Sequence, residues 1–287
     1  MSVEEVPMSM IQQMKKRISV RTYKEEFLPP ELKEKINLAF KDNQGPFGGA
    51  VRFEFVEREL AQKEGNIKLG TYGVIKGASS YIVAAIPEGK RDLEDFGYVL
   101  EKLILYATYL GLGTCWLGGT YTKNEFGKAI GLQAGEIMPC ITPIGYPHQK
   151  RSLLESAMRL AAGSKNRKPW QELFFNQALG RPLTEAEADK YATPLEMVRL
   201  APSAPNKQPW RIIMAQGGIH FYLQRTKDYG KGLGFDIQRV DMGIAMCHFE
   251  LAAKELGLPG QWQIIESKAD AAESTIPPGT HYIVSWV

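Results

Sequence analysis

The chain has 287 residues, a length that fits two lobes better than one, and 44% of them are hydrophobic, enough to build real cores. Its 35 basic and 32 acidic residues leave a formal charge of +3 without a polybasic run, so nothing in this balance demands nucleic acid or a membrane surface as a partner. The sequence shows neither signal-peptide features nor an apolar run of about 18 to 20 residues, and we expect a cytoplasmic protein.

The cysteines and histidines argue against disulfide and metal chemistry. Cys115, Cys140 and Cys247 are odd in number, far apart and without CxxC spacing, which favours free thiols in a reducing compartment. The four histidines are scattered, and none belongs to a metal-binding motif. We therefore expect no metal site and no disulfide framework.

The first half of the chain is predicted to form a short helix, then a helix, two strands, a long helix and a further strand. Hydrophobic spacing places these elements at residues 11–16, 32–40, 51–56, 81–86, 95–110 and 137–147. The long helix has apolar residues at three-to-four spacing, and Gly111 is expected to end it. A charged insert at residues 57–70 could cover a binding site.

The second half repeats this order, with elements predicted at residues 195–201, 210–215, 219–224, 241–256 and 281–287. A constant shift of 146 residues (241 minus 95) aligns the two long helices and carries Gly97 onto Gly243 and Trp116 onto Trp262. Two unrelated amphipathic helices that end alike are the alternative. The single register that includes both tryptophans favours a duplication.

We therefore predict an α+β fold duplicated in tandem within one chain, with a mixed sheet flanked by helices in each lobe. The expected boundaries are residues 1–150 for the first lobe, 151–190 for a linker and 191–287 for a degenerate second lobe. The first part of the linker is polar and basic, as expected of a strap along the surface.

A basic motif, RISVRTY at residues 17–23, places Arg17, Ser19 and Arg21 at alternate positions. In an extended segment alternate side chains point the same way, and two guanidinium groups with a hydroxyl suit a phosphate. Taken alone, a solvated basic face is the simpler interpretation of this motif.

Three other segments carry ligand-binding features. GLGTCWLGG at residues 111–119 is rich in glycine, which lets a backbone approach a flat ligand, although a plain loop could look the same. APSAPNKQPW at residues 201–210 combines rigid prolines with polar side chains, although an ordinary helix-to-strand turn is the alternative. KNRKPW at residues 165–170 adds cations in the linker.

Together these segments resemble the nitroreductase family. RISVRTY resembles the RRSxRxF motif of that family, APSAPNKQPW its PSxxNxQPW loop, LGLGTCWLGG its helix-end and flavin-edge loop, and KNRKPWQELF its KxRKPLEEL segment. The ordinary family pattern is an intertwined homodimer that builds two FMN sites, each from both subunits. Here each motif occurs once: KDNQGPFGG at residues 41–49 and PGQWQII at residues 259–265 lack the patterns of their counterparts. The chain is therefore similar to the single-chain branch called putative TM nitroreductases, which implies one FMN per chain and a monomer.

The resemblance implies which residues bind FMN. Those of the basic motif and the linker would hold the phosphate, with Arg21 near the N1 and O2 edge of the flavin. The backbone of residues 117–119 would face N5, and the proline-rich loop would line the other face and the ribityl chain. The full set is Arg17, Ile18, Ser19, Arg21, Leu117, Gly118, Gly119, Lys165, Arg167, Pro202, Ser203, Ala204 and Asn206.

No catalytic side chain is predicted, because in such an enzyme the flavin carries the chemistry. Asp95 and Asp241 are interpreted as carboxylates at helix N-termini rather than as an acid pair. His248 is interpreted as a helix-surface or interface histidine rather than as a base.

The function implied by the resemblance is an FMN-dependent oxidoreductase that uses NADH or NADPH to reduce a nitroaromatic or quinone-like acceptor in two half-reactions. A flavin-binding sensor or carrier, or a specialised reductive enzyme for a single metabolite, is the alternative. A structural protein that has lost its cofactor is a third class. A narrow, covered pocket would favour the specialised enzyme.

Overall fold

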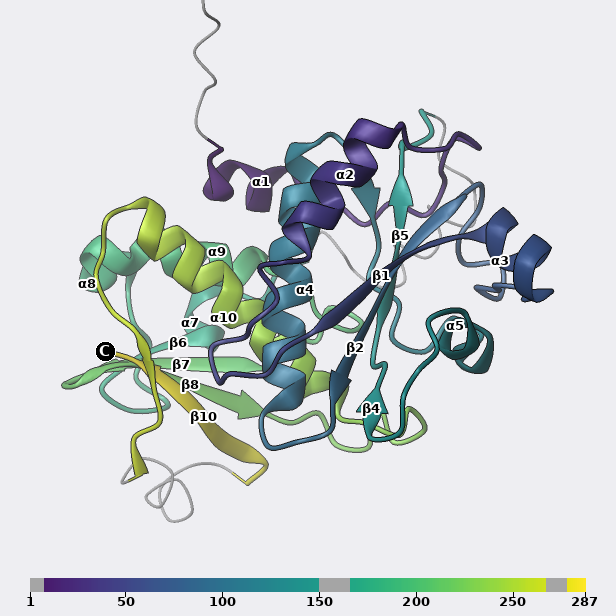
Figure 1. Cartoon of the computed structure of the whole chain (residues 1–287). Coiled ribbons are helices and arrows are strands. Elements are labelled where there is room, and N and C mark those ends of the chain that lie inside the picture. Colours follow the sequence, from purple (N-terminus) through teal and green to yellow (C-terminus); the bar gives the residue numbers. More distant parts are fainter. Residues whose placement is uncertain (1–7, 150–165, 267–277) are drawn as a thin grey trace, which may run out of the picture.

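The computed structural model describes residues 8–149, 166–266 and 278–287 (Figure 1). It contains two sheets of five strands each, and a long helix packs on each of them. The two long helices also pack against each other, between the sheets (Figure 1). This arrangement is α+β, as the element order predicts.

The first sheet contains β1 (Arg52–Glu57), β2 (Ser80–Pro87), β5 (Ile141–Gly145) and β3 (Gly113–Thr114) in that order, and β4 (Glu136–Ile137) pairs with β2. All of these pairs are antiparallel. The prediction of a mixed sheet is therefore wrong for the named strands of this half. Within residues 8–149, parallel pairing is confined to isolated bridges, between Ser19 and Thr114 and between Thr22 and Lys76.

The second sheet is mixed, as predicted. Its order is β6 (Phe174–Asn176), β7 (Trp210–Ala215), β8 (Gly218–Gln224), β10 (Thr280–Trp286) and β9 (Trp262–Gln263). β6 and β7 are parallel and the other pairs are antiparallel. The strands β7, β8 and β10 thus follow the same spatial order as β1, β2 and β5 in the first sheet.

The helices surround these sheets and fill the space between them. In the first half they are α1 (Met10–Lys16), α2 (Pro30–Ala39), α3 (Arg58–Gly65), α4 (Asp92–Tyr109) and α5 (Lys123–Ala129). In the second half they are α7 (Trp170–Leu173), α8 (Glu185–Ala188), the 3-10 helix η1 (Asp189–Tyr191), α9 (Ala192–Leu200) and α10 (Ile237–Glu255).

The long helices α4 and α10 cross at two glycines. A Cβ atom on Gly97 would lie 2.1 Å from the Val240 carbonyl oxygen, and one on Gly243 would lie 2.0 Å from the Glu94 carbonyl oxygen. The contacting residues correspond under the same shift of 146 (240 minus 94, and 243 minus 97), so the crossing looks the same from either helix. Only glycine permits this close approach of two backbones.

Both long helices begin earlier than the hydrophobic spacing predicts. α4 begins at Asp92 rather than Asp95, and α10 begins at Ile237 because the Asp236 side chain caps it by accepting a hydrogen bond from the Gln238 amide. The extra turn of α10 brings Ile237 and Val240 to the pocket described below.

One buried cluster joins both halves. It includes Phe96 and Leu100 from α4, Met242 and Phe249 from α10, and strand residues of both sheets. A second cluster lies around Phe126 and packs on the first sheet alone. The two halves therefore share one core. No helix in the described ranges combines the length and apolar character needed to cross a bilayer.

Candidate functional site

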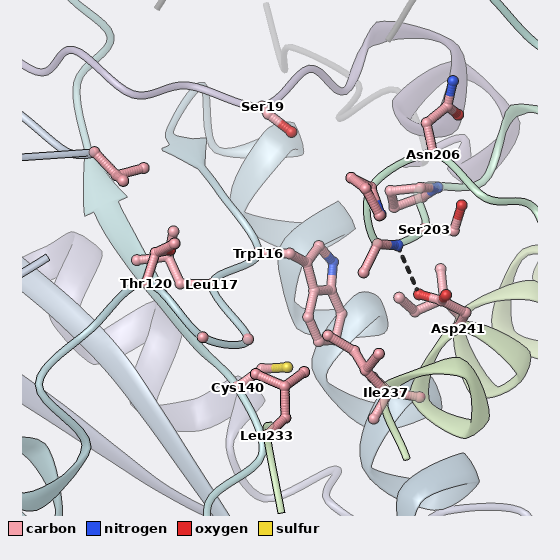
Figure 2. Close-up of a pocket in the computed structure, with 18 of the residues that line it drawn as sticks. Ser19, Trp116, Leu117, Thr120, Cys140, Ser203, Asn206, Leu233, Ile237 and Asp241 are labelled. Atoms are coloured by element: carbon pink, nitrogen blue, oxygen red, sulfur yellow. Dashed lines mark hydrogen bonds between the residues drawn. The ribbon is translucent and has the colours of Figure 1, made fainter. Parts of the chain in front are cut away.

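A pocket of about 460 Å³ lies where the two halves meet, and twelve of the thirteen predicted residues line it (Figure 2). The volume falls in the range of small-molecule and cofactor sites. These twelve residues are Arg17, Ile18, Ser19, Arg21, Leu117, Gly118, Gly119, Arg167, Pro202, Ser203, Ala204 and Asn206. The thirteenth, Lys165, lies outside the described residues.

The basic motif forms one wall because its backbone is extended. The Val20 amide donates to the Thr114 carbonyl at 2.8 Å, and the Lys76 amide donates to the Arg21 carbonyl at 2.9 Å. Val20 is buried against the core on one side of the segment. Arg17, Ser19 and Arg21 line the pocket, as alternate positions of an extended segment should.

Buried guanidinium groups give this wall its charge. In the described part of the chain, Nη1 of Arg17 and Nε of Arg21 are buried without a hydrogen-bond partner. Burial, with Arg17 and Arg199 nearby, lowers the pKa of Arg167 to about 10. Buried guanidinium nitrogens that lack an acceptor are costly, so this arrangement fits an anion with several acceptor oxygens, such as a phosphate.

The proline-rich loop forms the facing wall. The Ser203 Oγ accepts a hydrogen bond from the Gln208 amide at 2.8 Å, which closes the loop on itself. Asn206 and Gln208 both have positive φ, of 64° and 49°, a conformation that non-glycine residues adopt only where the surroundings hold them. The loop is thus a rigid support for its side chains.

Arg167 and Lys168 clamp this loop. The Arg167 guanidinium donates to Asn206 Oδ1 and, at 2.7 Å, to the Leu200 carbonyl at the end of α9. The Lys168 amide donates to Gln208 Oε1 at 2.8 Å. Arg167 therefore both supplies charge to the pocket and holds the opposite wall in place.

The glycine-rich motif GLGTCWLGG, at residues 111–119, lies at the other end of the pocket. Figure 2 shows Cys140, Leu233 and Ile237 gathered at this end, away from Ser19 and Asn206. A Cβ on Gly118 would lie 2.5 Å from Ile237 Cδ1, and one on Gly119 would lie 2.7 Å from Leu233 Cδ2. The second half of the chain therefore packs directly on this backbone, and burial raises the pKa of the Cys140 thiol beside it.

Asp95 lies in the first turn of α4, as interpreted, whereas Asp241 lies a turn inside α10 and is not an N-terminal carboxylate. Asp95 accepts from the amides of Phe47 at 2.8 Å and Gly49 at 2.6 Å, and Asp241 accepts from the Ala204 amide at 3.0 Å. Each carboxyl group therefore anchors the loop of its own half. Burial raises the pKa of Asp95 to about 6 and raises the pKa of Asp241 well above its usual value.

Comparison with known proteins agrees with these motifs. The model of the putative TM nitroreductase family matches residues 9–253. The chain belongs to this family. No protein of curated function matches the sequence.

A solved structure shows the same fold over nearly the whole of this nitroreductase-family chain. A putative nitroreductase from Thermotoga maritima MSB8 is 21% identical, with a TM-score of 0.60, and the match covers 91% of this chain and 92% of that one. A nitroreductase with bound FMN from Desulfitobacterium hafniense DCB-2 is 20% identical, with a TM-score of 0.42 over 51% of this chain and 93% of that one. A nitroreductase family protein from Clostridium novyi NT is 24% identical, with a TM-score of 0.38 over 50% of this chain and 87% of that one.

Sequence reasoning missed the apolar part of the pocket. The missed lining residues, which include the polar Thr120 and Asp241, come from segments far apart in the chain: Val74, Trp116, Thr120, Cys140, Pro205, Tyr229, Leu233, Ile237, Val240, Asp241 and Ile244. Trp116 and Pro205 lie within the glycine-rich and proline-rich motifs, and the others lie outside the four motifs. The insert at residues 57–70 contributes none of the lining residues, whereas the glycine-rich segment 226–236 contributes Tyr229 and Leu233. Its three glycines before a long helix were the only signal available in the sequence.

His248 is an interface residue and not a surface residue. It is wholly buried on α10, where Nδ1 lies 2.9 Å from the Met197 carbonyl and Nε2 lies 2.9 Å from Glu101 Oε1. Its partners therefore belong to α9 and α4. Within the described residues, no group of three or more histidine, cysteine or acidic side chains could hold a metal ion.

Proposed function

We propose that this protein is an FMN-dependent oxidoreductase that binds one FMN per chain. The observation that carries the proposal is the convergence of the basic motif and the proline-rich loop, nearly 200 residues apart, on one pocket. In the basic motif, the buried Arg17 Nη1 without a hydrogen-bond partner matches the phosphate of FMN in charge and in hydrogen-bonding capacity.

The pocket's own residues would divide the cofactor between them. Arg17, Ser19 and Arg167 would hold the phosphate at one end, and Lys165 would join them. Arg21 would place a cation near the N1 and O2 edge, where negative charge develops on reduction. The backbone of residues 117–119 would face N5, and the proline-rich loop would line the ribityl chain.

When bound, FMN would supply hydride chemistry, taking a hydride from NADH or NADPH and passing it to an electron-poor aromatic acceptor such as a quinone or nitroaromatic. The protein's part is to hold the ligand, to shape access to it and to tune its charge. No side chain is assigned as a catalytic acid or base.

A second candidate is a specialised reductase for one metabolite. The observation that favours it is the close packing of Leu233 on Gly119 and of Ile237 on Gly118. This packing narrows the end of the pocket where the flavin ring would lie, which we call the ring end. A panel of acceptors that differ in size distinguishes the two candidates. Turnover of many quinones and nitroaromatics supports the broad reductase, and turnover of one narrow structural class supports the specialised enzyme.

We also propose that the chain is a fused pseudo-dimer that functions as a monomer, with a first lobe at residues 1–150, a linker at 151–190 and a degenerate second lobe at 191–287. The support is the common order of β1, β2 and β5 with β7, β8 and β10, together with the reciprocal glycine contacts at the helix crossing. Each half would donate a different part of a single site.

The direct experiment measures the visible absorbance of the purified protein and identifies the released cofactor by mass. Addition of NADH or NADPH under argon should bleach the flavin band, and an acceptor should restore it. Colourless protein that takes up no FMN would overturn the cofactor assignment. Flavin-bound protein that neither nicotinamide reduces would overturn the activity alone.

A further inference from the structure

A buried polar network lies directly behind the pocket, and two of its members, Glu101 and His248, belong to none of the motifs. Glu101 on α4 is wholly buried and accepts a hydrogen bond from Trp116 Nε1 at 2.7 Å, and its Oε1 lies 2.9 Å from His248 Nε2. Arg17 Nε lies 3.8 Å from the Glu101 carboxyl group. Arg17 and Trp116 both line the pocket, so Glu101 connects His248 to the pocket wall.

The partners of His248 define where protons must lie. Nδ1 faces the Met197 carbonyl, which can only accept, so Nδ1 carries a hydrogen. A neutral ring would then present a bare Nε2 to Glu101 at 2.9 Å, and an ionised carboxylate there would place two acceptors against each other. One further proton must therefore lie between them, either on His248 or on Glu101.

Both placements of that proton leave the same charge. A positive His248 beside an ionised Glu101, or a neutral His248 beside a protonated Glu101, leaves one net positive charge on the group formed by Arg17, Glu101 and His248. Without the proton, Glu101 would neutralise Arg17, because a buried pair at 3.8 Å interacts strongly. The proton therefore keeps the charge of Arg17 available to the pocket.

We infer that Glu101 and His248 are positioning residues that hold one shared proton, and that this proton reserves the Arg17 charge for the phosphate of the bound ligand. The inference rests on the proposed FMN site. His248 also binds the Met197 carbonyl in the last turn of α9. This carbonyl lies three residues before the Leu200 carbonyl that Arg167 binds. His248 therefore supports the helix that leads into the proline-rich loop.

Other ionisable groups lie around this network. Cys247 precedes His248 on α10 and lies in the electrostatic range of Glu101, Lys102 and Glu250, and burial raises the pKa of its thiol. Tyr98 on α4 lies near Cys247 and Glu250, and burial raises the pKa of its hydroxyl. Among the described residues, no hydrogen bond joins either group to His248 or Glu101, so the test must separate the shared proton from its surroundings.

FMN and riboflavin differ only in the phosphate, so their relative affinity isolates the Arg17 charge. His248→Gln keeps a donor for Glu101 but carries no charge, and we expect it to weaken FMN binding about tenfold while leaving riboflavin binding unchanged. Glu101→Gln keeps hydrogen bonds to Trp116 and to a neutral His248, and it should retain the wild-type preference for FMN. In the double variant Glu101→Gln/His248→Gln the preference should return.

Dissociation constants are measured by quenching of flavin fluorescence, with Cys247→Ala as a control for a buried change on the same helix turn. If the double variant regains the wild-type preference for FMN over riboflavin, the inference is supported. A purely structural loss caused by His248→Gln would not be reversed by a second substitution at Glu101. If wild-type protein binds FMN but His248→Gln keeps the full preference, the inference is wrong. If His248→Gln does not fold, Glu101→Gln alone decides: a retained preference supports the inference, and a tenfold rise in FMN affinity overturns it. Wild-type protein that binds neither flavin would instead overturn the proposed function.

Discussion

At the scale of single residues, the pocket is defined by buried guanidinium groups, of which Arg17 and Arg21 each keep a nitrogen without a hydrogen-bond partner in the described structure. Arg17 has a side chain only 7% exposed, and Arg167 is held by Asn206 and the Leu200 carbonyl. Burying such groups costs free energy unless a ligand completes their hydrogen bonds. Ligand affinity should therefore depend strongly on each of them.

Arg17→Ala should weaken FMN binding roughly ten- to hundredfold, because charged hydrogen bonds contribute about 1.5 to 3 kcal/mol each. The measurement is a fluorescence titration with FMN. Lys16→Ala is the matched control, since Lys16 is exposed, adjacent in the chain and outside the pocket. An affinity that does not change in Arg17→Ala would remove Arg17 from the phosphate site.

Asp95 should make the stability of the protein depend on pH. Its pKa is raised to about 6 by burial, above the value of about 3.9 in an unfolded chain. The folded state therefore binds this proton more tightly, so the contribution is fully present below about pH 4 and is lost as the pH rises through about 6. Between pH 7 and pH 5 the wild type should gain about 1 kcal/mol of unfolding free energy relative to Asp95→Asn. Chemical denaturation at several pH values measures this difference, and parallel curves for the two proteins would contradict it.

At the scale of elements, two features shape the site: the crossing of α4 and α10, and the glycine-rich segment 226–236. The crossing brings the two halves close enough to share a core. The segment is held at its ends by an ion pair between Arg225 and Asp236 and by the Thr226 amide donating to Gln238. Between these anchors it places Tyr229 and Leu233 in the pocket.

Gly97→Ala should destabilise the protein by about 3 kcal/mol or more, because its Cβ would meet the Val240 carbonyl oxygen at 2.1 Å and neither backbone can move freely. Gly89→Ala is the control, since a Cβ there meets nothing within 4 Å, and it should change stability by about 0.5 kcal/mol or less. Thermal or urea unfolding gives both values. Equal stabilities of the two variants would show that the helices do not approach as closely as described.

Leu233→Ala should widen the ring end of the pocket and improve the use of bulky acceptors. The expected change is roughly a tenfold rise in kcat/KM for a two-ring quinone relative to benzoquinone. Leu256→Ala serves as control, because Leu256 is an exposed leucine outside the pocket. A ratio that stays at the wild-type value would show that Leu233 does not limit acceptor size.

At the scale of the whole molecule, the site needs both halves of one chain. The first half supplies the basic motif and the glycine-rich loop, and the second supplies the proline-rich loop and α10. A single chain thus brings together walls that in a symmetric dimer would come from different subunits.

We therefore expect one FMN per 32.1 kDa chain and a monomer in solution. Sedimentation equilibrium combined with absorbance at the flavin and protein bands measures mass and stoichiometry together. Two flavins per chain would contradict the single site, and a stable dimer would contradict the monomer.

The sequence by itself determined the order of the elements, the family and nearly all of the polar wall of the pocket. This was possible because amphipathic spacing, glycine stops and the motifs around Arg17 and Asn206 are local patterns whose physical meaning does not depend on distant contacts. Helix starts were less accessible, since the first turns of α4 and α10 depend on a cap and on packing.

Only the tertiary structure decided which apolar residues close the pocket, what Asp95 and Asp241 bind, and that His248 joins Glu101 behind Arg17. These facts depend on how α4 and α10 cross and on where loops far apart in the chain meet. A buried carboxyl group and a surface one look alike in a sequence, because burial is a property of the whole fold.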